Sequence, residues 1–145
     1  MINDKEVGMI SVEVACPFCQ RSLMDSENPI SGIPSITLLG KMPEEAGGAQ
    51  GLIRLSAYYG DYTVDTALVI PPGTVVGFFC PFCRHSLTST RDCDSCQAPM
   101  VALQFPRGGR VQFCSRRSCK KHLIEFEDPE SDLREFYRRF SPFLE

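Results

Sequence analysis

The sequence has few of the features that mark enzymes and membrane proteins. It contains no tryptophan, two histidines and no apolar run near the ~20 residues that cross a bilayer. It has no Gly-rich phosphate loop and no Ser or Cys nucleophile with an evident base, so we expect no enzymatic activity. Residues 1–14 carry charged side chains and no apolar segment of signal-peptide length. These absences predict a cytoplasmic protein without a membrane segment, whose thiols stay reduced.

Cysteine is abundant by contrast, and its spacing is regular. Eight cysteines fall into four close pairs, and the first two pairs share the pattern Cys-Pro-Phe-Cys. Two thiolates that are two residues apart at a tight turn can bind one metal ion from the same side, and a second pair completes a tetrahedron. Four pairs therefore predict two metal sites. The pairs are Cys16 with Cys19, Cys80 with Cys83, Cys93 with Cys96, and Cys114 with the wider-spaced Cys119.

Three other uses of the cysteines stay open. Disulfides need an oxidising compartment, and thioredoxin-like redox chemistry needs a helix after the Cys pair, whereas the segments here are short and turn-rich. Iron in a Cys₄ site is a third alternative, as in rubredoxin-type electron carriers. That family has Gly after the second Cys of each pair, whereas this sequence has Gln20, Arg84 and Gln97. Zinc is therefore favoured.

The segments between the cysteines predict a chain that is rich in strands. Their β-branched and aromatic residues alternate, and Gly, Pro and Asp punctuate them. We expect strands at 7–15, 35–39, 75–79 and 122–126, an inserted hairpin of 52–59 and 62–70 around Gly60-Asp61, an irregular loop at 26–34 and a flexible loop at 41–51.

A second similarity predicts which pairs share a metal. Residues 103–113 enter Cys114 in the way that 69–79 enter Cys80, with a Pro- and Gly-containing turn in each. This repeat groups Cys16, Cys19, Cys80 and Cys83 in site 1, and Cys93, Cys96, Cys114 and Cys119 in site 2. The rival grouping places Cys80, Cys83, Cys93 and Cys96 on one metal, and Cys16, Cys19, Cys114 and Cys119 on the other.

The Cys pairs, whose tight turns are called knuckles, and the strands that flank them, from about 12 to 120, resemble the zinc-ribbon superfamily. The resemblance implies two Zn²⁺ ions, with iron possible, but it implies no particular function, because zinc ribbons serve many roles. The fold class that we expect is mostly β, a small α+β protein of two ribbon-like units. The expected divisions are 1–90 with an enlarged β insertion, 91–127 as a second ribbon, and 128–145 as a C-terminal helix packed on the same domain.

The expected C-terminal helix begins after Asp128, which can cap it, with Pro129 in the first turn. Its apolar residues form one stripe that packs on the protein's own sheet or docks a partner. The stripe consists of Leu133, Phe136, Tyr137 and Phe140.

The net charge is −3, yet one stretch near the second Cys set is strongly basic. These cations either contact a nucleic acid or offset the charge of the thiolates. They are Arg107, Arg110, Arg116, Arg117, Lys120 and Lys121. His85 and His122 lie close enough to cysteines to replace a thiolate, although eight thiols already complete two sites.

A closed Cys₄ site has no open position for a substrate, so its metal stabilises the fold. We therefore expect a non-catalytic zinc-binding adaptor or accessory subunit that contacts a protein partner through the segment 52–79 and the terminal helix. A nucleic-acid-binding zinc ribbon is the alternative function, and a rubredoxin-like iron electron carrier is the third.

Overall fold

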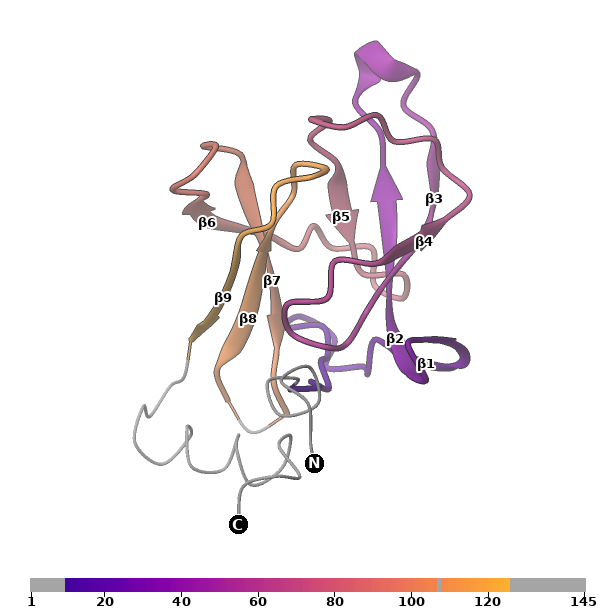
Figure 1. The fold of residues 1–145 in the computed structure, drawn as a ribbon, viewed down its shortest axis with the longest axis vertical. Helices are drawn as coiled ribbons and strands as arrows, with labels where there is room; N and C mark the ends of the chain where they lie inside the picture. The colour runs from indigo at the N-terminus through magenta and orange to yellow at the C-terminus, as the bar shows by residue number, and fades with distance from the viewer. Residues whose placement is uncertain (1–9, 107, 126–145) are drawn as a thin grey trace, which may run out of the picture.

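The computed structural model describes residues 10–106 and 108–125, and within them the protein is built of two antiparallel sheets. The prediction of a mostly β fold is confirmed. Figure 1 shows the five-stranded sheet on the right and the four-stranded sheet on the left. The expected C-terminal helix and its stripe of Leu133, Phe136, Tyr137 and Phe140 lie outside the described residues.

The strands follow the chain order within each sheet. The first sheet has the order β1-β2-β3-β4, with β5 paired to β2, and the second has the order β6-β7-β8-β9. The first sheet consists of β1 Met24–Ile30, β2 Ile33–Lys41, β3 Gln50–Leu55, β4 Val64–Thr66 and β5 Gly77–Phe79, and the 3₁₀ turn η1 Glu44–Ala46 lies between β2 and β3. The second sheet consists of β6 Thr88–Asp92, β7 Pro99–Gln104, β8 Arg110–Cys114 and β9 His122–Glu125.

Two predicted loops differ from the structure. The prediction of an irregular loop at 26–34 is wrong, because β1 and β2 form a hairpin there. Ser31 and Gly32 close that hairpin with φ values of 55° and 85°. Positive φ at both central residues is typical of the two-residue turns that match strand twist. The loop expected at 41–51 is shorter, because β2 extends to Lys41 and β3 begins at Gln50.

The inserted hairpin is present but its strands are shorter than predicted. Leu55 pairs with Val64 and Ile53 with Thr66, so the connection between β3 and β4 spans 56–63. Ile53 is buried whereas Leu52 is 43% exposed, as the predicted alternation of faces requires.

The similarity used to group the cysteines is wrong in structural terms. Residues 103–113 do form a hairpin of β7 and β8, but Val69 is 86% exposed and no strand covers 69–70. Instead β5 pairs with β2, and Val75 forms a bridge with Arg116. The segment before Cys80 is therefore not equivalent to the segment before Cys114.

The structure contains a different internal repeat. The first repeat covers residues 10–66 and the second covers residues 74–124. In each, a Cys knuckle is followed by a pair of antiparallel strands and then by two more strands, β3 and β4 in the first repeat and β8 and β9 in the second. Equivalent backbone hydrogen bonds connect these elements. The equivalent N–H to O bonds are Val12 to Ala57 and Val76 to Ser115, Leu23 to Val14 and Leu87 to Phe78, Thr37 to Leu23 and Ala102 to Leu87, and Ser56 to Thr63 and Cys114 to Lys121. Cys80 is thus equivalent to Cys16.

The two repeats exchange strand pairing. Ala15, just before the first knuckle, forms a bridge with Gln104 of β7, whereas Phe79, just before the second knuckle, pairs with Leu39 of β2. Each repeat therefore extends the sheet of the other, and one hydrophobic core contains buried residues of both. A smaller buried cluster surrounds Met100.

Candidate metal centres

Three of the four Cys pairs adopt the same tight turn, which we call a knuckle. In the first, Gln20 N–H donates to Cys16 O at 2.9 Å and Cys16 N–H donates to Arg21 O at 3.0 Å. The residue after the second Cys has a left-handed backbone, a conformation that is strained for residues other than Gly. The φ values are 65° at Gln20, 66° at Arg84 and 65° at Gln97.

Centre 1 brings together the four thiols that the predicted grouping assigns to site 1. The sulfurs of Cys16, Cys19, Cys80 and Cys83 all lie within 4.8 Å of one another. Cys16 Sγ lies 3.7 Å from Cys83 Sγ, and Cys19 Sγ lies 3.7 Å from Cys80 Sγ, so both contacts join the first repeat to the second. Four sulfurs at about 2.3 Å from a tetrahedral zinc ion would be about 3.8 Å apart. The spacing therefore fits one metal ion.

Backbone N–H groups already point at the sulfurs of centre 1. Phe18 and Cys19 N–H donate to Cys16 Sγ at 3.3 and 3.4 Å. Phe82 and Cys83 N–H donate to Cys80 Sγ at 3.4 and 3.5 Å. Such donors favour the thiolate form, which is the form that binds metal.

The two knuckles of centre 1 also contact each other reciprocally. The Phe18 ring stacks on His85 of the other knuckle, with centroids 4.4 Å apart and planes at 15°. The Arg21 guanidinium lies over the Phe82 ring at 5.1 Å. Phe18 and Phe82 nevertheless remain 54% and 51% exposed. His85 thus has a surface contact, and it is not part of the four-thiol group.

Centre 2 holds the other predicted set, all from the second repeat. Cys93, Cys96, Cys114 and Cys119 also lie with their sulfurs within 4.8 Å of one another. Cys93 Sγ is 3.7 Å from Cys119 Sγ, and Cys96 Sγ is 3.4 Å from Cys114 Sγ. The wider Cys114–Cys119 turn closes through Ser118 at φ 77°. His122 lies in β9.

The grouping therefore matches the predicted sites, and the rival grouping is not formed. Every cysteine is a free thiol, and the sulfur contacts are far longer than the about 2.05 Å of a disulfide. No βαβ unit surrounds a Cys pair in the described residues, so the thioredoxin-like alternative has no structural basis. Within residues 10–106 and 108–125, these are the only groups of three or more candidate ligands.

Burial and nearby hydrogen-bond donors shift the pKa values of several thiols. Burial raises the pKa of Cys16 to about 12, despite the N–H groups of Cys19 and Phe18 that lower it. Burial likewise raises the pKa of Cys114 and of Cys119. In contrast, the Ala98 N–H and the Arg116 side chain lower the pKa of Cys96 to about 6. A metal ion must therefore displace protons from Cys16, Cys114 and Cys119.

The first repeat has no counterpart of centre 2. Ser56 and Asp61 occupy the positions equivalent to Cys114 and Cys119, and the turn at Ser31 replaces the Cys93–Cys96 knuckle. The backbone is retained, because Asp61 N–H donates to Tyr58 O as Cys119 N–H donates to Arg116 O. Hydrogen bonds of Asp61 stand where the second repeat has a four-thiol group.

The Asp61 carboxylate is the acceptor in that replacement. Ser31 Oγ donates to its Oδ2 at 3.0 Å, and Thr63 donates to its Oδ1 through Oγ1 at 2.7 Å and through N–H at 3.1 Å. Partial burial alone would raise the pKa of Asp61, but the donors Thr63, Ser56 and Ser31 lower it. Sequence reasoning missed this cluster, because Ser56 and Asp61 do not resemble a Cys pair.

The described residues of the predicted basic stretch have different surroundings. Arg116 lies against centre 2, where Cys96 raises the pKa of its guanidinium, and its Nη1 donates to Gly73 O at 2.9 Å. Lys121 Nζ is 3.3 Å from Asp94 Oδ1. Arg117 and Lys120 line a cleft between the repeats. Arg110 is the first residue of β8, and Arg107 lies outside the described residues.

Comparisons of the chain with protein families, with curated proteins and with solved structures found no match. Among the described residues, no helix is long and apolar enough to cross a membrane.

Proposed function

We propose that this protein is a non-catalytic adaptor or accessory subunit whose fold is held by two structural zinc ions. The observation that carries the proposal is the closed coordination of both centres. Four thiols converge in each, and in each two of them are buried, Cys16 and Cys80 in centre 1 and Cys93 and Cys114 in centre 2. A metal ion with four protein ligands has no open position for a substrate, so it stabilises structure.

Zinc is the metal that we assign to both centres. Iron would accept the same four thiolates, but the left-handed positions that are Gly in rubredoxin-type carriers are Gln20, Arg84 and Gln97 in this chain, which favours zinc. Elemental analysis of the purified protein distinguishes the two. We expect two zinc ions per chain and a colourless protein, whereas a coloured protein with a reversible redox couple would support the electron-carrier alternative.

The partner surfaces that we propose combine the predicted segments with the knuckle rings. Segment 52–79 exposes Leu52, Tyr62 and Val69 by 43%, 41% and 86%, and Phe18 and Phe82 are half-exposed beside centre 1. Exposed aromatic rings held by a neighbouring side chain suit a protein interface, because little conformational freedom is lost on binding. The C-terminal stripe remains a further proposed contact.

A native pull-down tests the adaptor proposal. The sample is divided, and one half is treated with nuclease. A stoichiometric protein partner that survives the nuclease, and that is lost when Phe18 and Phe82 are replaced by Ser, supports the proposal. Recovery of nucleic acid alone would contradict it and would favour the second candidate, a nucleic-acid interface. The observation behind that candidate is that Arg117 and Lys120 line the same cleft as three tyrosines, with Lys120 Nζ 5.6 Å from the centre of the Tyr62 ring.

A further inference from the structure

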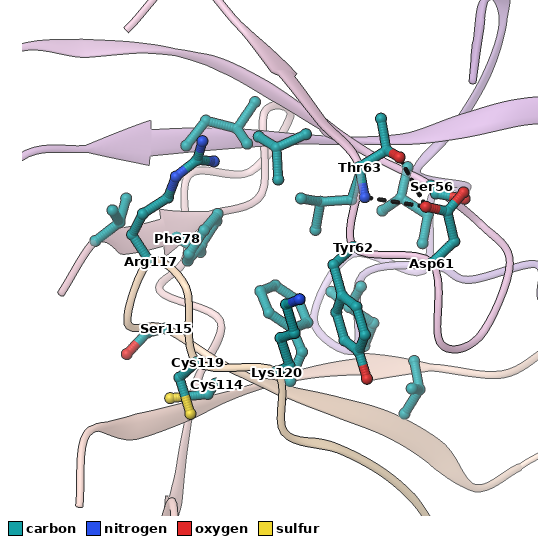
Figure 2. Close-up of a pocket in the computed structure, with 18 of the residues that line it drawn as sticks. Ser56, Asp61, Tyr62, Thr63, Phe78, Cys114, Ser115, Arg117, Cys119 and Lys120 are labelled. Carbon is teal, nitrogen blue, oxygen red and sulfur yellow. Dashed lines mark hydrogen bonds between the residues drawn. The ribbon is translucent and has the colours of Figure 1, made fainter. Parts of the chain in front are cut away.

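A cleft of about 300 Å³ lies between the two repeats, next to centre 2 (Figure 2). Its walls include two equivalent segments, 56–62 of the first repeat and 114–120 of the second. The first keeps the backbone of the metal-binding turn but has no thiols. The cleft is therefore similar in backbone on both sides and different in side chains.

The difference in side chains follows a simple pattern. Tyr58, Tyr59 and Tyr62 occupy the positions equivalent to Arg116, Arg117 and Lys120, and all six line the cleft. One wall is aromatic and the opposite wall is cationic. The two walls meet where Lys120 Nζ lies 5.6 Å from the centre of the Tyr62 ring.

Two of the cations have no acidic partner within residues 10–106 and 108–125. Arg116 is held against Cys96 and Gly73 O, but Arg117 and Lys120 form no ion pair with any described residue. Among the described lining residues Asp61 is the only carboxylic acid, and its carboxylate accepts hydrogen bonds from Thr63 and Ser31. The thiols of Cys114 and Cys119 in the lining belong to centre 2, beside Arg116. Lys120 is exposed and Arg117 is half-buried, so the cationic wall has positive charge at the solvent-facing side of the cleft, which we call its mouth, that is available for an anion.

The interior of the cleft is apolar. Buried and half-buried side chains of both repeats line it, and the polar groups lie mainly on the two walls described above. The apolar lining residues include Ile53, Leu55, Ile70, Val76, Phe78 and Phe113. An apolar cavity with a few placed polar groups is the usual form of a small-molecule site, and this volume is at the lower end of the range of about 300–1,000 Å³.

We propose that the cleft binds an amphipathic anion, in which a small apolar body carries a single carboxylate, sulfonate or phosphate. The apolar body occupies the interior against Phe78 and Ile53, and the anionic group meets Arg117 and Lys120 at the mouth. This inference goes beyond the adaptor proposal and does not depend on it. Tyr62 belongs both to the proposed partner segment and to the cleft, whereas Phe18 and Phe82, the positions that the pull-down varies, are not part of the cleft lining.

The fluorescent aromatic sulfonate ANS has this chemistry and serves as the probe, with the metal-loaded full chain. We expect saturable binding of one ANS per chain. The double variant Arg117→Glu/Lys120→Glu should bind ANS at least about tenfold more weakly, because two attractive charges become repulsive. The charge-conserving variant Arg117→Lys/Lys120→Arg should retain binding, and both should retain two metal ions. Equal affinity in all three proteins would overturn the proposal.

A second pair of variants tests the interior without changing charge. Ile70→Trp fills the cleft, whereas Val69→Trp adds the same group at the neighbouring, 86% exposed position that is not part of the lining. We expect Ile70→Trp to abolish ANS binding and Val69→Trp to leave it unchanged. Unchanged binding in Ile70→Trp would show that ANS binds elsewhere and would overturn the proposal.

Competition identifies the source of the apolar body. Displacement of ANS by decanoate supports an alkyl acid, and displacement by 1-naphthoate supports an aromatic acid. Displacement by AMP alone would mean a nucleotide site and would contradict the apolar body that the interior requires. Failure of all three competitors would also overturn the proposal.

Discussion

Removal of one ligand from each centre should have very different consequences, although the two positions are equivalent within their knuckles. Cys19 and Cys96 are each the second, half-buried cysteine of a knuckle with the same hydrogen bonds. We predict that Cys19→Ala unfolds both sheets, whereas Cys96→Ala disturbs only the surroundings of centre 2.

Loop closure alone does not account for that difference. A cross-link between Cys19 and Cys80, 61 positions apart, removes about 4 kcal/mol of chain entropy from the unfolded state. A cross-link between Cys96 and Cys114, 18 positions apart, removes about 3 kcal/mol. A gap of about 1 kcal/mol would scarcely separate the two variants.

The surroundings of the two centres decide the outcome. Cys16 and Cys80 are part of the main core, which is shared by both repeats and both sheets. Centre 2 instead lies in a small cluster around Ala98 and Met100. Zinc contributes about 10–16 kcal/mol in small structural sites, and a whole domain is stable by about 5–15 kcal/mol. Loss of centre 1 therefore removes more free energy than the shared core can replace, whereas the turns at centre 2 can open locally.

Two-dimensional amide NMR with zinc present is the assay. Cys96→Ala should keep one zinc ion and dispersed signals for core residues such as Leu38 and Ile53. Cys19→Ala should lose dispersion in both sheets, including β7. If Cys19→Ala kept a native second sheet, the repeats would be independent ribbons and the shared-core reasoning would be refuted.

Three further predictions concern single positions. Gln97→Gly should raise the free energy of unfolding by about 0.5 kcal/mol, because relief of left-handed strain of ~1–2 kcal/mol exceeds the added chain entropy of ~0.4–1 kcal/mol; a lower melting temperature would contradict this. Asp61→Ala should lower the free energy of unfolding by about 0.5–1.5 kcal/mol with both zinc ions retained, because the exposed Ser31 and Thr63 lose their protein acceptor and bond to water instead. Unchanged denaturant unfolding would count against it. Because burial raises the pKa of the Cys16 thiol to about 12 in the metal-free protein, that thiol keeps its proton at pH 7 and zinc must displace it, so zinc affinity should fall as pH falls; calorimetry in buffers of different ionisation enthalpy should show proton release, and pH-independent affinity would oppose the prediction.

The sequence predicts the metal centres better than it predicts the strands between them. Paired cysteines specify their own local turn, because each knuckle closes through hydrogen bonds within a few residues, such as that from Gln20 N–H to Cys16 O. The left-handed backbone at Gln20 was not predictable, since Gln carries no signal for positive φ. The hairpin that turns at Ser31-Gly32 was likewise not predicted, because the residues of its two strands include several that usually form turns, such as Asn28, Pro29 and Pro34.

The internal repeat was hidden for two physical reasons. The connections between the equivalent strands differ, with η1 and its flanking loop in the first repeat and a short turn around Phe105 in the second. In addition, hydrogen bonds at Asp61 replace metal ligation at Cys119, so the equivalent turns share geometry and no cysteine. Backbone pairing shows the relation throughout, whereas residue identity is concentrated at the two Cys-Pro-Phe-Cys knuckles and at Ser22-Leu23 and Ser86-Leu87 just after them.

The central claim is that each metal is held by one particular set of four thiols. Cadmium-113 substitution followed by metal-to-cysteine NMR couplings measures this directly. We predict two cadmium resonances, with Cys19 and Cys83 coupled to one and Cys96 and Cys114 coupled to the other. Coupling of Cys19 and Cys83 to different cadmium ions would contradict the two centres described here.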